Sequence, residues 1–183
     1  MIGKTLVEDV LSNKERLFMD SKESFANTRD IFTARLQSYI HDTEKYLEAA
    51  VIGEIGNNSF DHNFGYISQY PGGVYCNVMY EGHYIVLADY GKGVRKSLLN
   101  VLKEIPSDKE AVEIAFTKMI SGRAPEQRGN GLKFVSEVIQ EHDWSLFFQS
   151  GVGSCSINKK GLIFTEEAVS TTGCLAIINF NGA

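Results

Sequence analysis

The two halves of the chain differ in the spacing of their apolar residues. In the first half, apolar positions recur every three to four residues across 6–11 and 31–40, which predicts amphipathic helices. In the C-terminal third, short apolar runs separated by polar residues and glycine predict strands, with a hairpin turn at Lys159-Lys160-Gly161. These predicted strands cover 144–149, 154–158, 162–165 and 174–180.

The helical spacing continues across 47–55 into a further predicted helix that ends between His62 and Gly65. Asp42 or Thr43 is the expected cap, because short oxygen-bearing side chains accept hydrogen bonds from the first N–H groups of a helix. The sequence therefore predicts a helix that spans about 44–62 and carries Glu54.

Glycine and proline divide the middle of the chain. After a turn at 71–73, residues 74–80 and 84–89 alternate as a β-hairpin joined by Glu81-Gly82-His83. Beyond the hairpin we expect a weak helix at 94–105, a helix capped by Ser107 or Asp108 and running to about 120, a mobile polar loop at 121–128, and a helix from about 129 to 141.

Helices in the first half and strands mostly in the second indicate the α+β class. We expect a two-layer α/β sandwich in which helices cover one face of a mixed, mainly antiparallel sheet. A chain of 183 residues is most simply one domain. Within 1–183, residues 1–41 would form a helical N-terminal extension packed on a core of residues 42–183.

The composition is ordinary for a globular protein, with 43% hydrophobic and 22% charged residues. A net charge of -5 argues against a nucleic-acid-binding surface. No leader peptide and no run of about 20 apolar residues is visible, so no membrane association is expected. Cys76, Cys155 and Cys174 have no Cys-x-x-Cys spacing, which predicts buried free thiols and a cytoplasmic protein.

A polar stripe interrupts the apolar pattern of the helix predicted near 47–62. Glu54, Asn58, Asp61 and His62 share one helical face, because positions three and four apart are neighbours. Buried carboxylates are costly unless they are paired, so a hydrated metal ion and a nucleotide would account for the stripe. Two glycine motifs follow downstream, Asp89-Tyr-Gly91-Lys-Gly93 and Arg128-Gly129-Asn130-Gly131-Leu132.

In order and spacing, these three motifs resemble the N, G1 and G2 boxes of the GHKL superfamily of histidine-kinase-like ATP-binding domains. That group includes histidine kinases, gyrase-type ATPases, MutL and the anti-sigma-factor serine kinases. The resemblance covers roughly Asp42 to Phe180 and is carried by the joint order of the motifs. It implies the Bergerat fold, ATP and Mg²⁺ as ligands, and a size closest to the stand-alone anti-sigma-type kinases.

The resemblance implies a role for each residue of the polar stripe. Asn58 would be the Mg²⁺ ligand, since this ion takes few protein oxygens besides water and phosphate. Glu54 would be the catalytic general base for the water or hydroxyl that attacks the γ-phosphate. Asp61 would make a water-mediated nucleotide contact, and His62 fits either the end of this box or a packed core histidine. Glu-x-x-x-Asn alone also fits an ordinary solvated helix.

The first glycine motif would bind the adenine base. The resemblance implies that Asp89 accepts a hydrogen bond from the N6 amine and that Gly91 and Gly93 allow the backbone to approach the ligand closely. A plain turn at the end of a strand is the alternative. The family often has Gly-Thr before the last strand, whereas here Gly173 precedes Cys174, so no water-mediated adenine contact is expected there.

The second glycine motif would bind phosphate. Gly129, Gly131 and Leu132 would open a helix whose free N–H groups and positive dipole end attract anions, with Arg128 adding charge. The alternative is a glycine-rich turn with solvated arginines.

We therefore interpret residues 42–183 as an ATP-binding core with ATP or ADP, Mg²⁺ and a partner protein as ligands. Three functions fit the motifs: a kinase that phosphorylates Ser or Thr of a partner, a slow ATPase that drives conformational closure, and a non-catalytic ATP-gated interaction module. Glu54 together with Asn58 favours the two enzymes. The sequence does not separate them, because the acceptor is either another protein or water.

Overall fold

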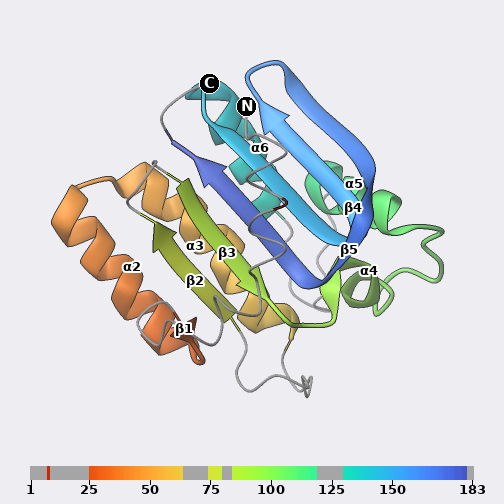
Figure 1. Ribbon diagram of the computed structural model, residues 1–183, viewed down its shortest axis with the longest axis horizontal. Coiled ribbons are helices and arrows are strands. Elements are labelled where there is room, and N and C mark those ends of the chain that lie inside the picture. The colour runs from red at the N-terminus through yellow and green to blue at the C-terminus, as the bar shows by residue number, and fades with distance from the viewer. Residues whose placement is uncertain (1–7, 9–24, 64–73, 80–83, 119–129, 181–183) are drawn as a thin grey trace.

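One layer of the molecule is a five-stranded antiparallel sheet (Figure 1). The computed structural model describes residue 8 and residues 25–63, 74–79, 84–118 and 130–180. Within these residues the strand order is β1-β2-β3-β5-β4, and each neighbouring pair is antiparallel. The strands are β1 (Phe25–Ala26), β2 (Val74–Met79), β3 (Tyr84–Asp89), β4 (Ser145–Asn158) and β5 (Gly161–Asn179).

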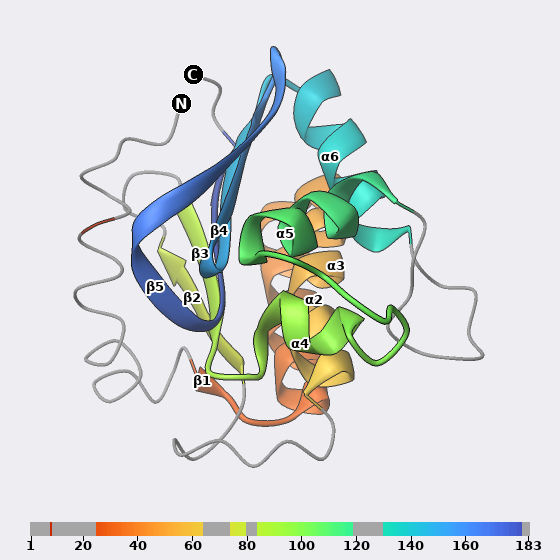
Figure 2. The same cartoon turned by 90° about the vertical axis from the view of Figure 1, so that its right-hand side faces the viewer.

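The described helices form a second layer on one face of this sheet (Figure 2). They are α2 (Arg29–Thr43), α3 (Tyr46–His62), α4 (Gly93–Leu98), α5 (Asp108–Thr117) and α6 (Gly131–Glu141). This arrangement confirms the predicted α+β class and two-layer α/β sandwich. The sheet was expected to be mixed and mainly antiparallel, and within the described residues all of its pairings are antiparallel.

The two layers meet in a hydrophobic core. Val51 and Ile52 of α3, Val135 and Ile139 of α6, and Ile178 of β5 are at most 1% exposed. Burial of one such side chain stabilises the fold by about 1.5–3 kcal/mol. Because the core fixes the apolar face of α3, the polar side chains on its adjacent face have a defined direction.

The predicted C-terminal strands merge into two long ones. β4 continues through Gly151, and β5 runs from Gly161 to Asn179 without interruption. The stretch 150–153, expected to separate two strands, stays extended because it pairs with β5, and register shifts between Ser150 and Gly153 absorb the irregularity. The expected hairpin turn before Gly161 is confirmed, since Asn158 pairs with Gly161.

The helix that carries Glu54 begins later than predicted. Asp42 and Thr43 lie at the end of α2 and cap nothing in α3, which begins at Tyr46 without a side-chain cap. The two helices are separate because Glu44 adopts a left-handed conformation, with φ at 57°. The boundary expected between residues 41 and 42 consequently falls inside α2.

Other predicted elements agree with the structure to different degrees. The hairpin is confirmed, with β2 antiparallel to β3, and Ser107 caps α5 through a 3.1 Å bond that its Oγ accepts from Glu110 N. The weak helix at 94–105 is wrong beyond residue 98, since α4 ends at Leu98. α6 ends at Glu141 as predicted. The hairpin turn 81–83 and the loop 121–128 lie outside the described residues.

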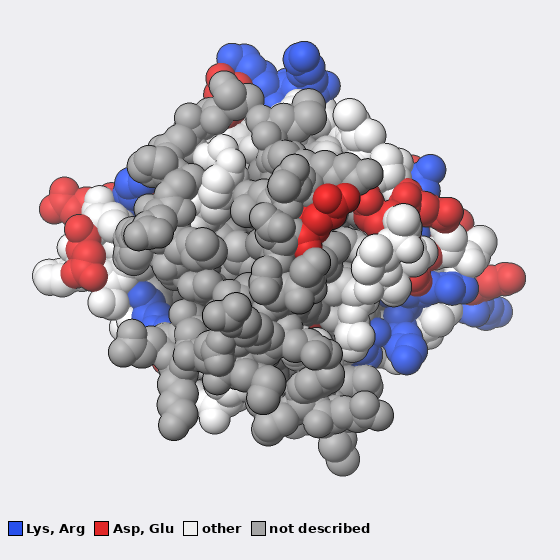
Figure 3. Space-filling view, viewed as in Figure 1, with Lys and Arg blue, Asp and Glu red and all other residues white. Residues whose placement is uncertain are grey.

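The described surface carries charges of both signs. On the face drawn in Figure 1, acidic and basic side chains occur together at both sides of the molecule (Figure 3). In the described part of the chain, no helix has the length and apolar character needed to cross a membrane.

Candidate functional site

A cavity of about 670 Å³ lies between the helical layer and the sheet. Its volume is typical of small-molecule sites, which are mostly apolar with a few placed polar groups. Both layers contribute apolar side chains to its lining. The helices contribute Ile55, Val94, Leu98, Leu132 and Phe134, and the strands contribute Leu87, Phe148 and Ala176. The cavity therefore offers an apolar wall on which a flat ring could pack, beside a separate set of polar groups.

The structure brings the three sequence motifs to this one cavity. The predicted site residues that line it are Glu54, Asn58, Asp89, Gly93, Gly131 and Leu132. They come from α3, the end of β3, and the first turns of α4 and α6. Asp61 and Gly91 are not among the lining residues, and Arg128 and Gly129 lie outside the described residues.

Glu54 and the start of α6 are in direct contact. Glu54 is exposed, and a Cβ atom at Gly131 would overlap its Oε2 atom. Glycine at 131 therefore lets α6 begin beside the carboxylate. The N-cap residue Asn130 makes no side-chain capping bond, so that side chain leaves the first N–H groups of α6 to other acceptors.

Asp89 is a buried acceptor at the end of β3. It is 2% exposed, yet it is one of the residues that line the cavity. Oδ2 accepts from Ser59 Oγ at 2.8 Å, and Oδ1 accepts from Gly91 N at 2.7 Å and from Asn63 Nδ2 at 3.3 Å. Hydrogen bonds to an ionised acceptor are stronger than neutral ones, so these donors stabilise the charge and fix the plane of the carboxylate.

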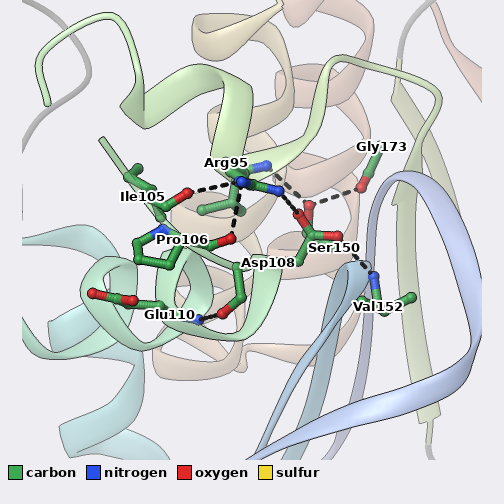
Figure 4. Close-up of polar contacts among 10 residues, drawn as sticks. Arg95, Ile105, Pro106, Asp108, Glu110, Ser150, Val152 and Gly173 are labelled. Carbon is green, nitrogen blue, oxygen red and sulfur yellow. Dashed lines mark hydrogen bonds and ion pairs between the residues drawn. The ribbon is translucent and has the colours of Figure 1, made fainter. Parts of the chain in front are cut away.

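Two left-handed glycines bring the neighbouring chain segments close to Asp89. Gly93 has a φ of 76°, and a Cβ atom there would lie 2.9 Å from Ser150 Oγ. That hydroxyl accepts from Val94 N at 2.9 Å and donates to Gly173 O at 3.1 Å (Figure 4). Gly173, with a φ of 71°, lies against Asp89 O, where a side chain would overlap. Ser150 at the bulge in β4 is thus bonded both to the start of α4 and to the left-handed glycine within β5.

A second polar network fixes α4 relative to α5 and β4. Arg95 donates from Nε to Ile105 O at 3.0 Å and from Nη2 to Pro106 O at 3.0 Å. Asp108, which begins α5, accepts from Val152 N at 3.1 Å (Figure 4). These bonds hold the irregular segment after α4 and so help to fix α4 beside the cavity.

His62 is a packed histidine that also lines the cavity. Its Nδ1 is 2.8 Å from Ser97 Oγ, which joins the end of α3 to α4. Burial lowers its pKa from the ordinary value, and the nearby positive charge of Lys92 lowers that pKa further. The ring is therefore neutral at pH 7 and contributes a hydrogen bond rather than a charge.

Sequence reasoning missed several residues of this site, among them Ser59, Arg29 and Asn63. Arg29, the first residue of α2, lines the cavity and forms an ion pair with Asp61, which explains where the Asp61 carboxylate is directed. Asn63 lines the cavity and bonds to Asp89. Arg29 is remote in sequence from Asp61, and Asn63 is remote from Asp89. The only local indication of either residue was that Asn63 directly follows the polar stripe.

The chain was also compared with known proteins. No protein-family model and no curated protein sequence matches it. The chemistry of the cavity is therefore inferred from its own residues and from the three motifs that meet there.

Proposed function

We propose that this cavity binds Mg²⁺-ATP and that the protein is a nucleotide-binding domain of the histidine-kinase-like type, with the Bergerat fold. The observation that carries the proposal is the meeting of the three motifs. Glu54 and Asn58 from α3, Asp89 from the end of β3, and Gly131 at the start of α6 line one cavity of nucleotide size. If these motifs were only solvated turns and an ordinary helix, their residues would not be expected to line the same cavity.

The base would lie beside Asp89. Its carboxylate accepts hydrogen bonds and offers no donor when ionised, so it matches an exocyclic amine such as adenine N6. The apolar wall that includes Leu87 and Phe148 would pack against the ring. Cys174 lies in the same wall, where the related family often has a threonine.

The phosphates would lie between Asn58 and the first turn of α6. Free N–H groups and the positive end of a helix dipole attract anions, and the start of α6 lines the cavity with Asn130, Gly131 and Leu132. Among the described residues no three His, Cys, Asp or Glu side chains form a metal cage. One neutral amide oxygen from Asn58 suits Mg²⁺, which keeps several waters and takes phosphate oxygens. When bound, Mg²⁺ would offset the charge on those oxygens.

Glu54 would act as the general base. It is exposed at the cavity, so a hydroxyl from a second protein can reach it. Its carboxylate would take the proton from that hydroxyl as the oxygen attacks the γ-phosphorus and ADP leaves. We infer transfer to a partner protein Ser or Thr. Hydrolysis is the second candidate, because the same exposure admits water.

Incubation with γ-labelled ATP tests this proposal. The wild-type chain is incubated alone and with protein extract from its source cells, and label on protein is compared with free labelled phosphate. Kinase activity predicts a labelled protein band in the extract that disappears with Glu54→Gln. Release of free phosphate by the chain alone would favour the ATPase. No transfer of either kind would refute a catalytic function.

A further inference from the structure

Asn63 connects two segments beside the cavity that are remote in sequence, the end of α3 and the turn after β3. It follows α3, and its Nδ2 donates to Ser59 O at 2.8 Å and to Asp89 Oδ1 at 3.3 Å. Its Oδ1 accepts from Lys92 N at 3.0 Å. One amide side chain thus uses its donor and its acceptor to join the end of α3 to the buried carboxylate and to the turn after β3.

Gly91 packs directly against this amide. A Cβ atom at 91 would overlap the Cγ, Oδ1 and Nδ2 atoms of Asn63. Gly91 does not line the cavity, whereas Asn63 does. The glycine therefore provides space for the asparagine side chain.

The torsion that turns an aspartate carboxylate is soft, so a carboxylate needs neighbours to hold its plane. Asp89 accepts hydrogen bonds at both oxygens, and Asn63 links one of these bonds to the turn that follows β3. An acceptor that is already oriented avoids the entropic cost of ordering when a ligand binds.

We propose that Asn63 is a positioning residue, which holds the Asp89 carboxylate in the orientation that receives the exocyclic amine of the base, and that Gly91 is required for this contact. The inference rests on the proposed function, since it takes the ligand to be an adenine nucleotide. Asn63 itself would act through Asp89 and need not touch the nucleotide.

The test compares Asn63→Ala with Gln140→Ala in the full chain. Gln140 is a matched control because its Nε2 donates to Ser136 O, four residues earlier, as Asn63 Nδ2 does to Ser59 O, but it does not line the cavity. Calorimetry would measure the affinities for Mg²⁺-ATP and for inosine triphosphate, which has the same phosphates and sugar but lacks the amine.

Asn63→Ala should weaken ATP binding by about 2- to 10-fold, the worth of one ordinary hydrogen bond, because the Asp89 carboxylate remains but is less well oriented. It should also bring the ratio of ATP to inosine triphosphate affinity toward one. Gln140→Ala should change neither affinity. Gly91→Ala should weaken ATP binding about as much as Asn63→Ala, because it displaces the amide. In the Asn63→Ala background it should add little, because the overlapping atoms are gone.

The outcomes separate this inference from the proposed function. Wild-type protein that binds no ATP at millimolar concentration would refute the proposed function itself. Wild-type protein that binds ATP, with the ratio unchanged in Asn63→Ala, would refute the positioning role alone. Additive losses for Gly91→Ala and Asn63→Ala would refute the role given to Gly91. If Asn63→Ala does not fold, Asn63→Leu is close in size and has neither donor nor acceptor, and the ratio of ATP to inosine triphosphate affinity is measured on that variant instead.

Discussion

Replacement of Asp89 by asparagine should change which base the cavity prefers. The geometry decides how the new amide lies. Oδ1 accepts from two N–H groups, those of Gly91 and Asn63, whereas Oδ2 accepts from the hydroxyl of Ser59. A hydroxyl can reverse and accept, but the two N–H groups cannot. The oxygen of the new amide would therefore take the Oδ1 position, and its NH₂ group would take the Oδ2 position.

An amine of adenine would then meet a donor where the wild-type protein offers a charged acceptor. Loss of a hydrogen bond to a charged group costs about 1.5–3 kcal/mol, which corresponds to about 10- to 150-fold in affinity. The O6 atom of guanine would gain a donor, so the preference for ATP over GTP should disappear or reverse. Because the hydrogen bonds at the Oδ1 position of Asp89 persist, the fold should remain.

Calorimetric titration of wild-type protein and Asp89→Asn with Mg²⁺-ATP and Mg²⁺-GTP measures both affinities. Urea unfolding of the two proteins controls for loss of the fold. Equal ATP affinity and unchanged selectivity in a folded variant would refute the reasoning and make Asp89 only a turn residue.

Three further predictions concern single residues of the cavity. Glu54→Ala should keep ATP affinity within about threefold but lower turnover by about a hundredfold to ten-thousandfold in a phosphate-release or transfer assay; a parallel loss of affinity would contradict its role as base. Cys174 should react with iodoacetamide and be protected by ATP in peptide mass mapping, whereas Cys155 should stay unreactive because burial raises its pKa to about 12. Acid should destabilise wild-type protein more than His62→Asn. The folded state has the lower His62 pKa, so the unfolded state binds the proton first, and stability is lost as pH falls below the ordinary value of 6.5. Equal pH dependence in urea unfolding between pH 7 and 5 would disprove this.

The fold class and the motif positions could be predicted because their signals are local. The spacing of apolar residues in 47–55 defines one face of α3, and Asp89 stands where an apolar strand meets glycines. Strand lengths were harder to predict, because residues 150–153 of β4 are extended through irregular pairing with Glu166, Thr171 and Cys174 of β5. That pairing outweighs the local preference of polar residues and glycine for turns.

The missed parts of the site depend on contacts between residues remote in sequence. Asn63 has no distinctive local pattern. Its structural role depends on hydrogen bonds to Asp89 and Lys92, which lie in a later part of the chain. Arg29 was assigned to a helical extension, but it lines the cavity and pairs with Asp61. Gly91 illustrates the same point, since a glycine motif predicts a close approach without identifying the atoms that approach.

Titration of the full chain with ATP, in the presence of Mg²⁺ and then of a chelator, tests the central claim most directly. We predict saturable one-to-one binding that weakens when Mg²⁺ is removed, and a smaller effect of Mg²⁺ in Asn58→Ala, whose side chain can no longer hold the ion. Wild-type protein that releases no heat and binds no ATP at millimolar concentration, with or without Mg²⁺, would contradict the account.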